Sequence, residues 1–168
     1  MNQVIKNKIL TAKTLSAYLA RWRLKGYTLV FTNGCFDLLH YGHIQYLTAA
    51  KSLGDKLIIG INSTSSVQRL KGKHRPINDD LTRLSILASF YFVDAIMVFS
   101  EDTPYELIQK IQPDILVKGG DYSIENIVGA DIVLGKGGIV KSLPFIEGYS
   151  TTNIENKIKD STQSHEES

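Results

Sequence analysis

Hydrophobic residues occur in short blocks that are separated by polar, glycine or proline positions, and the blocks alternate in character along the chain. Several are compact runs of β-branched and aliphatic residues, which are typical of strands buried on both faces. The run at 56–62 is one of these, with Gly54 and Asp55 forming the turn before it. The pattern predicts strands at residues 27–31, 56–62, 95–99, 115–118, 132–134 and 139–143.

Between these runs, apolar residues recur at helical spacing and the flanking residues supply helix boundaries. Thr14 can cap a helix that Gly26 ends, because a hydroxyl suits an N-cap and glycine suits the position after a helix. Pro104 fits the first turn of another helix, and Pro113 ends it. The pattern predicts helices at 14–25, from 42 onward, at 65–70, 80–90, between 103 and 113, and from 150 onward.

Alternating strands and helices predict an α/β fold: a Rossmann-like, doubly wound parallel sheet covered by helices on both faces. A chain of 168 residues that is 43% hydrophobic fits a single domain. We place this domain at residues 27–160, with an N-terminal helix in 1–26 packing on it. Residues 161–168 are polar and lack an apolar stripe, so we expect a disordered tail there.

Charge and cysteine content narrow the functional classes. A formal net charge of +2 is too small to indicate nucleic-acid or membrane binding as a main role. A single cysteine, Cys35, excludes an internal disulfide and a cysteine-based zinc site. The sequence shows neither a signal-peptide pattern nor a run long enough to span a bilayer, so we expect a cytoplasmic protein.

The stretch from Phe31 to His43 joins a strand end, a glycine turn and two histidines at the start of a helix. Glycine lets the backbone turn and approach a ligand, and the free N–H groups of a helix start favour anions. A lone histidine beside apolar residues is usually a core or surface group. Two histidines with Gly42 between them, after a strand and before a helix, instead favour a polyphosphate site with His40 and His43 at its mouth.

Three other segments are candidates for the same site, and each also has an ordinary structural interpretation. Lys71, Lys73 and Arg75 fit either a solvated basic loop or a loop that closes over an anionic substrate. Residues 118–122 place a lysine and a carboxylate beyond a strand end, which suits hydroxyl recognition but also a polar turn. Residues 150–152 can cap a helix and bind phosphate at once. Because ligands gather at the carboxyl ends of parallel strands, we expect these segments to converge on one cleft.

Residues 34–43 resemble the His-x-Gly-His signature of the cytidylyltransferase-like nucleotidyltransferase superfamily. Residues 69–78, 114–122 and 148–154 are similar, in order and spacing, to segments of bacterial D-glycero-β-D-manno-heptose 1-phosphate adenylyltransferases. The resemblance extends from about Thr14 to Lys159. It implies the nucleotidyltransferase (HxGH) type of sheet and the transfer of AMP from ATP to heptose 1-phosphate. The products would be ADP-heptose, for lipopolysaccharide core or surface glycan, and pyrophosphate.

The resemblance also implies roles for individual residues. His40, His43 and Lys71 are expected to be catalytic, and Asp37 to hold its loop through hydrogen bonds rather than to position a metal ion. Cys35 is interpreted as a small residue that shapes the turn, and not as a nucleophile. Expected nucleotide- and phosphate-binding residues are Thr32, Asn33, Cys35, Phe36, Gly42, Lys118, Gly119, Ser150, Thr151 and Thr152, and expected substrate-binding residues are Lys73, Arg75, Arg83, Asp121 and Tyr122.

Chemistry suggests why such a site uses imidazoles and lysines. The attacking phosphate monoester has a second pKa of about 6, so it is largely ionised at neutral pH without a protein base. The enzyme must align it with the α-phosphorus and stabilise the departing pyrophosphate. Mg²⁺ is expected to accompany ATP without a dedicated protein cage. A separate heptose 7-phosphate kinase is expected to supply the substrate, and the protein is expected to be a homo-oligomer.

Two other functions share part of the pattern. The His-x-Gly-His turn also suits a cytidylyltransferase that acts on glycerol 3-phosphate or a similar alcohol phosphate, and fold alone does not separate the two. A nucleotide-binding module without turnover is the second alternative.

One departure from the resemblance concerns Thr64, which follows Asn62 and Ser63 where relatives usually carry aspartate. The role of that aspartate must fall to Thr64, to a neighbour or to no residue.

Overall fold

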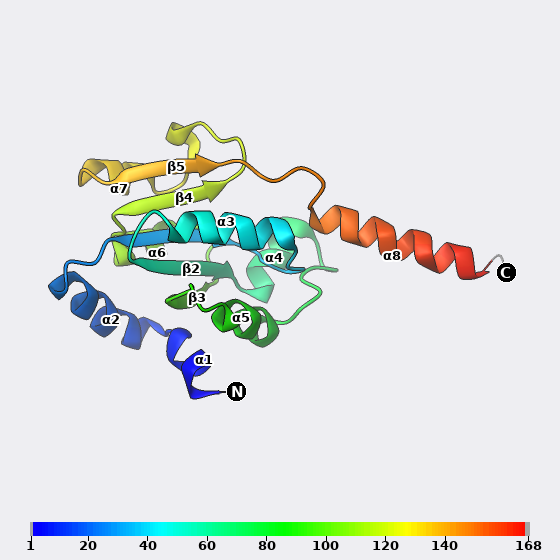
Figure 1. The fold of residues 1–168 in the computed structure, drawn as a ribbon, viewed down its shortest axis with the longest axis horizontal. Helices are drawn as coiled ribbons and strands as arrows, with labels where there is room; N and C mark the ends of the chain where they lie inside the picture. Colours follow the sequence, from blue (N-terminus) through cyan, green and yellow to red (C-terminus); the bar gives the residue numbers. More distant parts are fainter. Residues whose placement is uncertain (1, 167–168) are drawn as a thin grey trace.

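The computed structural model describes residues 2–166, and side chains as far as Ser161. Five parallel strands form one sheet in the order β3-β2-β1-β4-β5 (Figure 1). The register places Val30 of β1 between Leu57 of β2 and Ile115 of β4. The parallel α/β fold expected from the sequence is therefore confirmed. The strands are β1 (Leu29–Gly34), β2 (Lys56–Asn62), β3 (Ala95–Phe99), β4 (Ile115–Gly119) and β5 (Ile139–Leu143).

Helices connect the strands and also begin and end the described chain. Most lie where the sequence predicts them, and α1, in the N-terminal segment, is additional. The helices are α1 (Gln3–Lys8), α2 (Ala12–Leu24), α3 (Tyr41–Lys51), α4 (Thr64–Lys71), α5 (Asp80–Ser89), α6 (Tyr105–Ile111), α7 (Ala130–Gly135) and α8 (Thr151–Glu166), with a 3-10 turn, η1 (Ile124–Asn126).

The strand predicted at 132–134 is wrong, because these residues belong to α7. Ala130 and Val133 are buried while Leu134 is 49% exposed, so the apolar positions follow helical spacing. Backbone bonds from Gly137 to Leu134 and from Gly138 to Val133 then close the helix. A short apolar run does not distinguish a helical turn from a brief strand.

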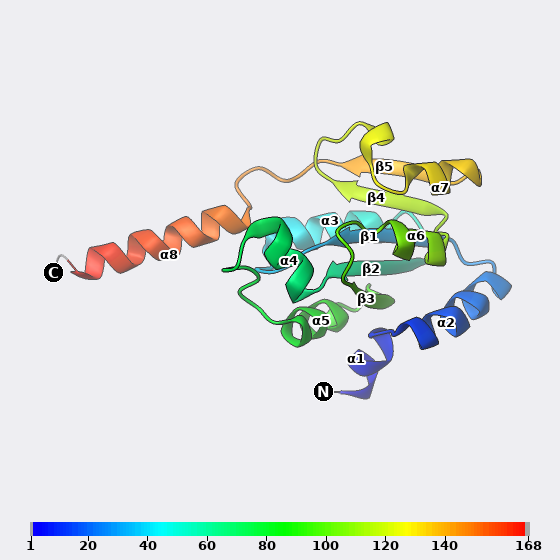
Figure 2. The ribbon, with the colours of Figure 1, turned by 180° about the vertical axis from the view of Figure 1, so that it is seen from behind.

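The two faces of the sheet carry separate hydrophobic clusters. Successive residues of β1 point to opposite faces, so Phe31 packs in one cluster and Val30 in the other. Helices α2, α6 and α7 cover the first face, and α3 and α5 cover the second, as Figures 1 and 2 show from opposite sides. The sheet is thus doubly wound.

The N-terminal segment is part of this core. Leu15, Leu19 and Trp22 of α2 are buried in the first cluster. Just before α2, Ile9 forms a parallel bridge to Ile96 of the edge strand β3, and the Leu10 amide donates to the Ile96 carbonyl at 2.8 Å. Residues 2–26 therefore cover the first face of the sheet and also pair with its edge strand.

The carboxyl ends of the strands all meet at one edge of the sheet, from which α8 runs outward past the sheet (Figure 1). Helix α8 continues through Glu166, into the segment for which the sequence predicts a disordered tail; residues 167 and 168 lie outside the described residues. Strand order reverses between β1 and β4, so an open crevice is expected beyond these two strands.

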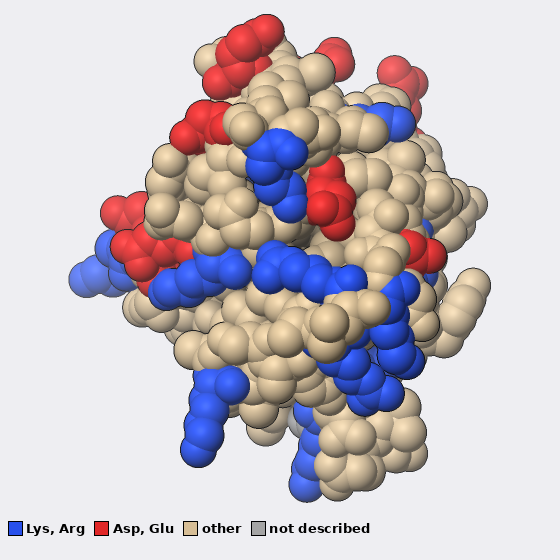
Figure 3. All heavy atoms as spheres, turned by 90° about the vertical axis from the view of Figure 1, so that its left-hand side faces the viewer, with Lys and Arg blue, Asp and Glu red and all other residues tan. Residues whose placement is uncertain are grey.

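The opposite end of the molecule, with the amino ends of the strands, faces the viewer in Figure 3. Lys and Arg side chains form a row across the middle of this face. These charges lie away from the carboxyl edge and do not contribute to the site described below.

None of the helices described here combines the length and the apolar character that a membrane span requires.

Candidate active site

Two adjoining cavities open at the carboxyl edge. The first has a volume of about 440 Å³ and lies among the ends of β1 and β4, α3 and the end of α4. The second, of about 350 Å³, lies between the start of α3 and the start of α8. Four residues line both cavities: His43, Tyr46, Phe145 and Thr151.

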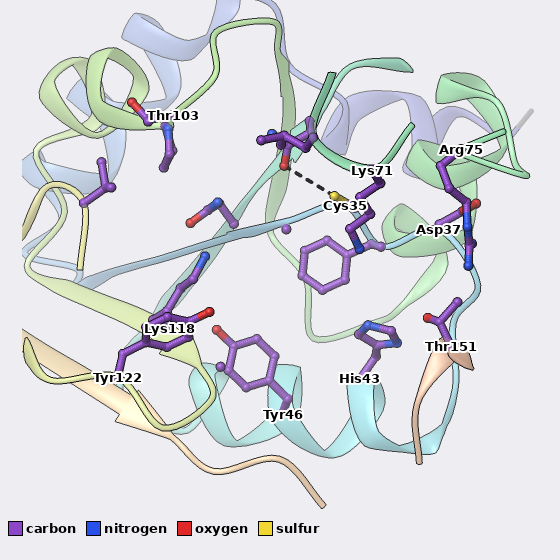
Figure 4. Close-up of a pocket in the computed structure, with 18 of the residues that line it drawn as sticks. Cys35, Asp37, His43, Tyr46, Lys71, Arg75, Thr103, Lys118, Tyr122 and Thr151 are labelled. Atoms are coloured by element: carbon purple, nitrogen blue, oxygen red, sulfur yellow. Dashed lines mark hydrogen bonds and ion pairs between the residues drawn. The ribbon is translucent and has the colours of Figure 1, made fainter. Parts of the chain in front are cut away.

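Most of the expected site residues converge here, although they come from distant parts of the chain. Figure 4 shows His43, Lys71 and Lys118 around the first cavity. The expected residues that line the first cavity are Asn33, Cys35, Phe36, His43, Lys71, Arg75, Lys118, Gly119, Tyr122 and Thr151, and the second adds His40, Gly42 and Ser150. Five do not line either cavity: Thr32, Lys73, Arg83, Asp121 and Thr152.

The turn after β1 has an unusual backbone conformation at Phe36. This residue has a φ of 45°, in the left-handed region that residues other than glycine rarely adopt. Its ring packs on Gly34, where an added Cβ would lie 3.0 Å from the Phe36 Cε2 atom. The same ring lies 5.5 Å, between centroids, from the imidazole of His43. The turn thus places one aromatic wall against the histidine.

His40 and His43 lie against each other at the start of α3. Their ring centroids are 3.9 Å apart, and the His40 amide donates to Nδ1 of His43 at 3.4 Å. Because Nδ1 accepts, Nε2 is the atom that carries the proton of a neutral His43 ring. Nδ1 of His40 is buried and has no hydrogen-bond partner among the described residues. Nε2 of His43 is therefore left to donate to a ligand, whereas Nδ1 of His40 is enclosed next to Gly42.

Both histidines favour their neutral form in the absence of a ligand. Burial, followed by the charges of His40 and Lys71, lowers the pKa of His43 to about 4. Burial also lowers the pKa of His40. A bound polyphosphate acts in the opposite direction, since a nearby negative charge favours the protonated form. Binding of a phosphate chain would therefore favour protonation of both imidazoles.

Gly42 leaves room for the His40 ring. An added Cβ would lie 3.0 Å from Nδ1 of His40 and 3.3 Å from Cβ of Tyr149. We expect Gly42→Ala to lower kcat about tenfold, because the His40 ring must move. The loss of stability should be small, because alanine favours the helix by about 1 kcal/mol relative to glycine. Steady-state kinetics and thermal unfolding measure the two effects.

The matched control for this prediction is Gly135→Ala. Gly135 also lies in a helix, and an added Cβ there has nothing within 4 Å. Its kcat should equal that of the wild type. Equal kcat values for Gly42→Ala and Gly135→Ala would show that the close approach to His40 is unimportant.

Thr32 has a different role from the one expected. Its side chain is fully buried, and its hydroxyl lies 2.5 Å from the hydroxyl of Tyr46. The Tyr46 hydroxyl also donates to the Val117 carbonyl at 3.3 Å, and burial raises the pKa of Tyr46 to about 12. Thr32 therefore links β1, α3 and β4 beneath the cavities, and the expectation of direct nucleotide contact is corrected.

Asp37 makes backbone hydrogen bonds, as the sequence predicts, but they hold the basic loop rather than its own turn. Its carboxylate accepts hydrogen bonds from the backbone amides of Ile77 and Asn78 at 2.8–2.9 Å, and from Arg75 at 2.7 Å. Burial alone would raise the pKa of Asp37, but the two amides and Arg75 together hold it below the usual value. The carboxylate is fully occupied in holding this loop to the turn after β1.

The three basic residues of the loop have different surroundings. Arg75 lines the first cavity, and it also pairs with Asp37 and with Glu155 of α8. Lys71, at the end of α4, is exposed and lines the first cavity. Lys73 is exposed but lines neither cavity. Of these three residues, only Lys71 lines the first cavity with His43 and forms no ion pair with a described residue.

Arg83 does not contact either cavity, although substrate binding was expected. Its side chain is completely buried, and its guanidinium donates to the Cys35 carbonyl and to the Asp80 carboxylate, both at 2.6 Å. A fully buried, paired guanidinium is inaccessible to a substrate phosphate. The expectation of substrate binding is therefore corrected to a contact behind the turn.

Lys118, near the end of β4, and Tyr122, in the segment after β4, line the first cavity. Burial lowers the pKa of Lys118, while the neighbouring Cys35 acts in the opposite direction. Nζ of Lys118 lies 5.9 Å from the centroid of the Tyr122 ring. Asp121 is exposed and lines neither cavity, whereas Tyr122 lines the first.

The start of α8 confirms that residues 150–152 cap a helix, which is one of the two roles considered for them. The Ser150 hydroxyl accepts from the Asn153 amide at 3.1 Å, which is a helix cap. Thr151 lines both cavities, whereas Thr152 is exposed and lines neither. The cap leaves the Thr151 hydroxyl facing the site.

Sequence reasoning missed several residues that line the site. Phe145 lines both cavities, and its ring lies on the glycine pair after β4: an added Cβ would approach it at 2.8 Å from Gly119 and 3.2 Å from Gly120. Asp102 and Thr103 follow the end of β3, so the rule that ligands gather at strand ends could have identified them. Tyr46 follows His43 by one helical turn and faces the same way.

A protein-family model described as cytidylyltransferase-like matches residues 31–157 of the chain. Two relatives are named bifunctional protein HldE. The one from Marinomonas sp. is 53% identical over 146 residues, covering 87% of this chain and 31% of that protein. The one from Campylobacter jejuni is 57% identical over 132 residues, covering 79% and 28%. The chain thus spans about a third of the length of these relatives.

Solved structures share the fold. A lipopolysaccharide core biosynthesis protein from Thermoplasma volcanium is 30% identical, with a TM-score of 0.58, and the match covers 74% of this chain and all of that one. A pantoate-β-alanine ligase from Francisella tularensis is 19% identical with a TM-score of 0.55, over 88% of this chain and 75% of that one, which shows the fold alone. Together with the family match over most of its length, these findings show that the chain belongs to the cytidylyltransferase-like family.

Proposed function

We propose that this protein transfers AMP from ATP to D-glycero-β-D-manno-heptose 1-phosphate, releasing pyrophosphate and forming ADP-heptose. One observation carries the proposal: His40, His43, Lys71, Lys118 and the start of α8 converge on two adjoining cavities. Cations and free N–H groups gathered in this way suit two phosphate-bearing substrates side by side. The similarity to HldE proteins over most of the chain supports the heptose substrate.

In the proposed reaction, an oxygen of the heptose phosphate attacks the α-phosphorus of ATP as the bond to pyrophosphate breaks. The attacking oxygen is already ionised, so the residues only need to align the substrates and stabilise charge. In this proposal His40 and His43 donate hydrogen bonds to the leaving phosphates, and Thr151 contacts the same phosphates at the start of α8. Lys71 and Lys118, which both line the first cavity, neutralise charge on the phosphates.

Magnesium is proposed to enter with ATP. Among the described residues, no group of three or more His, Cys, Asp or Glu side chains is placed to hold a metal ion. The carboxylate of Asp37 is taken up by Arg75 and two amides. The residues present therefore fit an ion held by phosphate oxygens and water, which would neutralise the triphosphate. The chain's own contribution is the cationic surroundings of that complex.

The proposal places the protein after a kinase, since heptose 1-phosphate requires a phosphoryl transfer for its synthesis. We propose that a heptose 7-phosphate kinase takes part in this supply, and that ADP-heptose feeds lipopolysaccharide core or another surface glycan. We further propose that the reaction takes place in the cytoplasm and that the protein is a homo-oligomer, which light scattering would test.

A pyrophosphate-release assay tests the proposed function. ATP, CTP and GTP are each combined with heptose 1-phosphate and with glycerol 3-phosphate. The proposal requires release mainly with ATP and heptose 1-phosphate. Release with CTP and glycerol 3-phosphate would instead identify an alcohol-phosphate cytidylyltransferase, and binding of ATP without release in any pair would identify a non-catalytic module.

Lys71 is expected to act on substrate use more than on stability. Its side chain is exposed, so Lys71→Ala should leave the unfolding temperature nearly unchanged. Loss of one charge-assisted contact should raise the KM for heptose 1-phosphate about tenfold. Lys13→Ala, an exposed lysine on α2 outside both cavities, is the matched control. An unchanged KM for Lys71→Ala would contradict the proposed contact of Lys71 with the substrate.

A further inference from the structure

Arg83 is a completely buried cation directly behind the site. It lies on α5, and Nη1 donates to the Cys35 carbonyl at 2.6 Å. Nη2 pairs with the Asp80 carboxylate, also at 2.6 Å, while Nε has no partner among the described residues. Burial of a guanidinium is costly unless its partners are well placed. A hydrophobic residue would fill the same space at lower cost, so the charge calls for a further explanation.

The bond to Cys35 fixes one peptide plane of the turn. In a trans peptide the carbonyl and the following N–H point in opposite directions. Because the Cys35 carbonyl faces Arg83, the N–H of Phe36 faces away from α5. Phe36 is also the residue with a φ of 45°, a conformation that costs energy without glycine. Arg83 therefore stabilises a strained peptide that the rest of the turn depends on.

The turn transmits this constraint to the catalytic histidine. Cys35 and Phe36 line the first cavity, and the Phe36 ring lies 5.5 Å from the His43 ring between centroids. If the Cys35 carbonyl rotated, Phe36 would lose its position beside Gly34 and His43 would lose one wall. Arg83 thus acts on His43 through two intervening residues and without contact to the cavity.

Asp80 anchors Arg83 from the other side. The same Asp80 oxygen accepts from the Thr64 amide at 2.9 Å and from the Thr64 hydroxyl at 2.6 Å. Thr64 is the first residue of α4, and Lys71 is the last. The Thr64–Asp80–Arg83 chain of hydrogen bonds therefore connects the helix that carries Lys71 to the turn beside His43. Thr64 supplies two donors to this chain, its amide and its hydroxyl.

We infer that Arg83 is a positioning residue, which orients the Cys35–Phe36 peptide and through it His43, held in place by Asp80 and Thr64. The inference rests on the proposed function for its kinetic test. A purely structural Arg83 would affect the stability of the fold but not the turnover of folded molecules. Turnover per folded molecule therefore distinguishes the two roles.

The experiment compares three variants with the wild type at a temperature at which circular dichroism shows each to be folded. Arg83→Lys keeps the charge but replaces the two Nη atoms of the guanidinium by a single ammonium nitrogen. One nitrogen cannot bind both the Cys35 carbonyl and the Asp80 carboxylate in the same geometry. Asp80→Asn weakens the anchor at a residue that is only partly buried. Asp94→Asn is the control, because Asp94 also binds two cations but lies far from the cavities.

The inference predicts that Arg83→Lys lowers kcat about tenfold while the KM for ATP changes less than about threefold. Asp80→Asn should give a smaller loss of kcat in the same direction. Asp94→Asn should lower the unfolding temperature and leave kcat unchanged. Wild-type kcat in folded Arg83→Lys would overturn the inference. If Arg83→Lys does not fold, wild-type kcat in Asp80→Asn would do the same.

A second readout separates this inference from the proposed function. The imidazole proton resonances of His43 and His74 are compared by NMR without any substrate. Arg83→Lys should shift the His43 resonances and leave those of the exposed His74 in place, whereas Asp94→Asn should shift neither. Absence of turnover in the wild type would reject the proposed function only. Unshifted His43 resonances in Arg83→Lys would reject the positioning role only.

Discussion

Replacing His43 by alanine is expected to lower kcat by about 10²–10³-fold without unfolding the protein, because the residue supplies charge stabilisation rather than packing. His43 lines both cavities, and its ring is held by His40, Phe36 and the His40 amide. Its proton-bearing Nε2 is the atom left free to follow the leaving pyrophosphate. Alanine removes that donor and opens the wall between the cavities.

The control for this prediction is His74→Ala, which removes an exposed imidazole from the basic loop outside both cavities. Steady-state kinetics with saturating ATP and sugar phosphate measure kcat, and circular dichroism confirms the fold. His74→Ala should keep wild-type kcat. A His43→Ala variant that also keeps it would contradict the proposed role of the histidine pair.

Replacing Asp37 by alanine is expected to lower the free energy of unfolding by about 3 kcal/mol, because it removes a buried carboxylate that accepts from one guanidinium and two amides. The Asp37 side chain is only 6% exposed, and it binds Arg75 together with the amides of Ile77 and Asn78. Loss of the carboxylate frees the basic loop from the turn beside His43. Urea unfolding followed by the fluorescence of the buried Trp22 measures the change.

The pH dependence of this effect has a definite sign. The pKa of Asp37 in the folded protein lies below its ordinary value of 3.8. A depressed pKa adds stability above the unfolded-state value, and that stability is lost as pH falls through the folded value. The difference in unfolding free energy between wild type and Asp37→Asn should therefore be constant near neutral pH and shrink below about pH 4. A difference that does not change with pH would contradict the ionised contact.

The sequence predicted the framework well because strands leave a strong local pattern. The bounds of β2 and β3 agree with the predicted runs at 56–62 and 95–99, and the glycine turn between β1 and α3 lies where it was expected. The segments after β1, β4 and β5 converge because parallel strands end at one edge. That part of the site follows from topology alone.

The sequence was less informative about which way a side chain points near a strand end. Thr32 and Asn33 are neighbours, yet Thr32 faces Tyr46 beneath the sheet edge while Asn33 lines the first cavity. Alternation along a strand decides this, but its phase depends on the final packing. Arg83 was misassigned for a similar reason, because its helix turns it toward the Cys35 carbonyl. Phe145 was missed because the loop after β5 returns it to the site only in three dimensions.

The central claim is transfer at the α-phosphorus of ATP by direct attack of the sugar phosphate. The measurement that tests it most directly is ³¹P NMR of the products formed from ATP and heptose 1-phosphate carrying ¹⁸O in its terminal phosphate oxygens. The account predicts ADP-heptose that retains the label, including the bridging oxygen, and unlabelled pyrophosphate. ADP together with a sugar bearing a new phosphoryl group, or pyrophosphate that contains ¹⁸O, would contradict it.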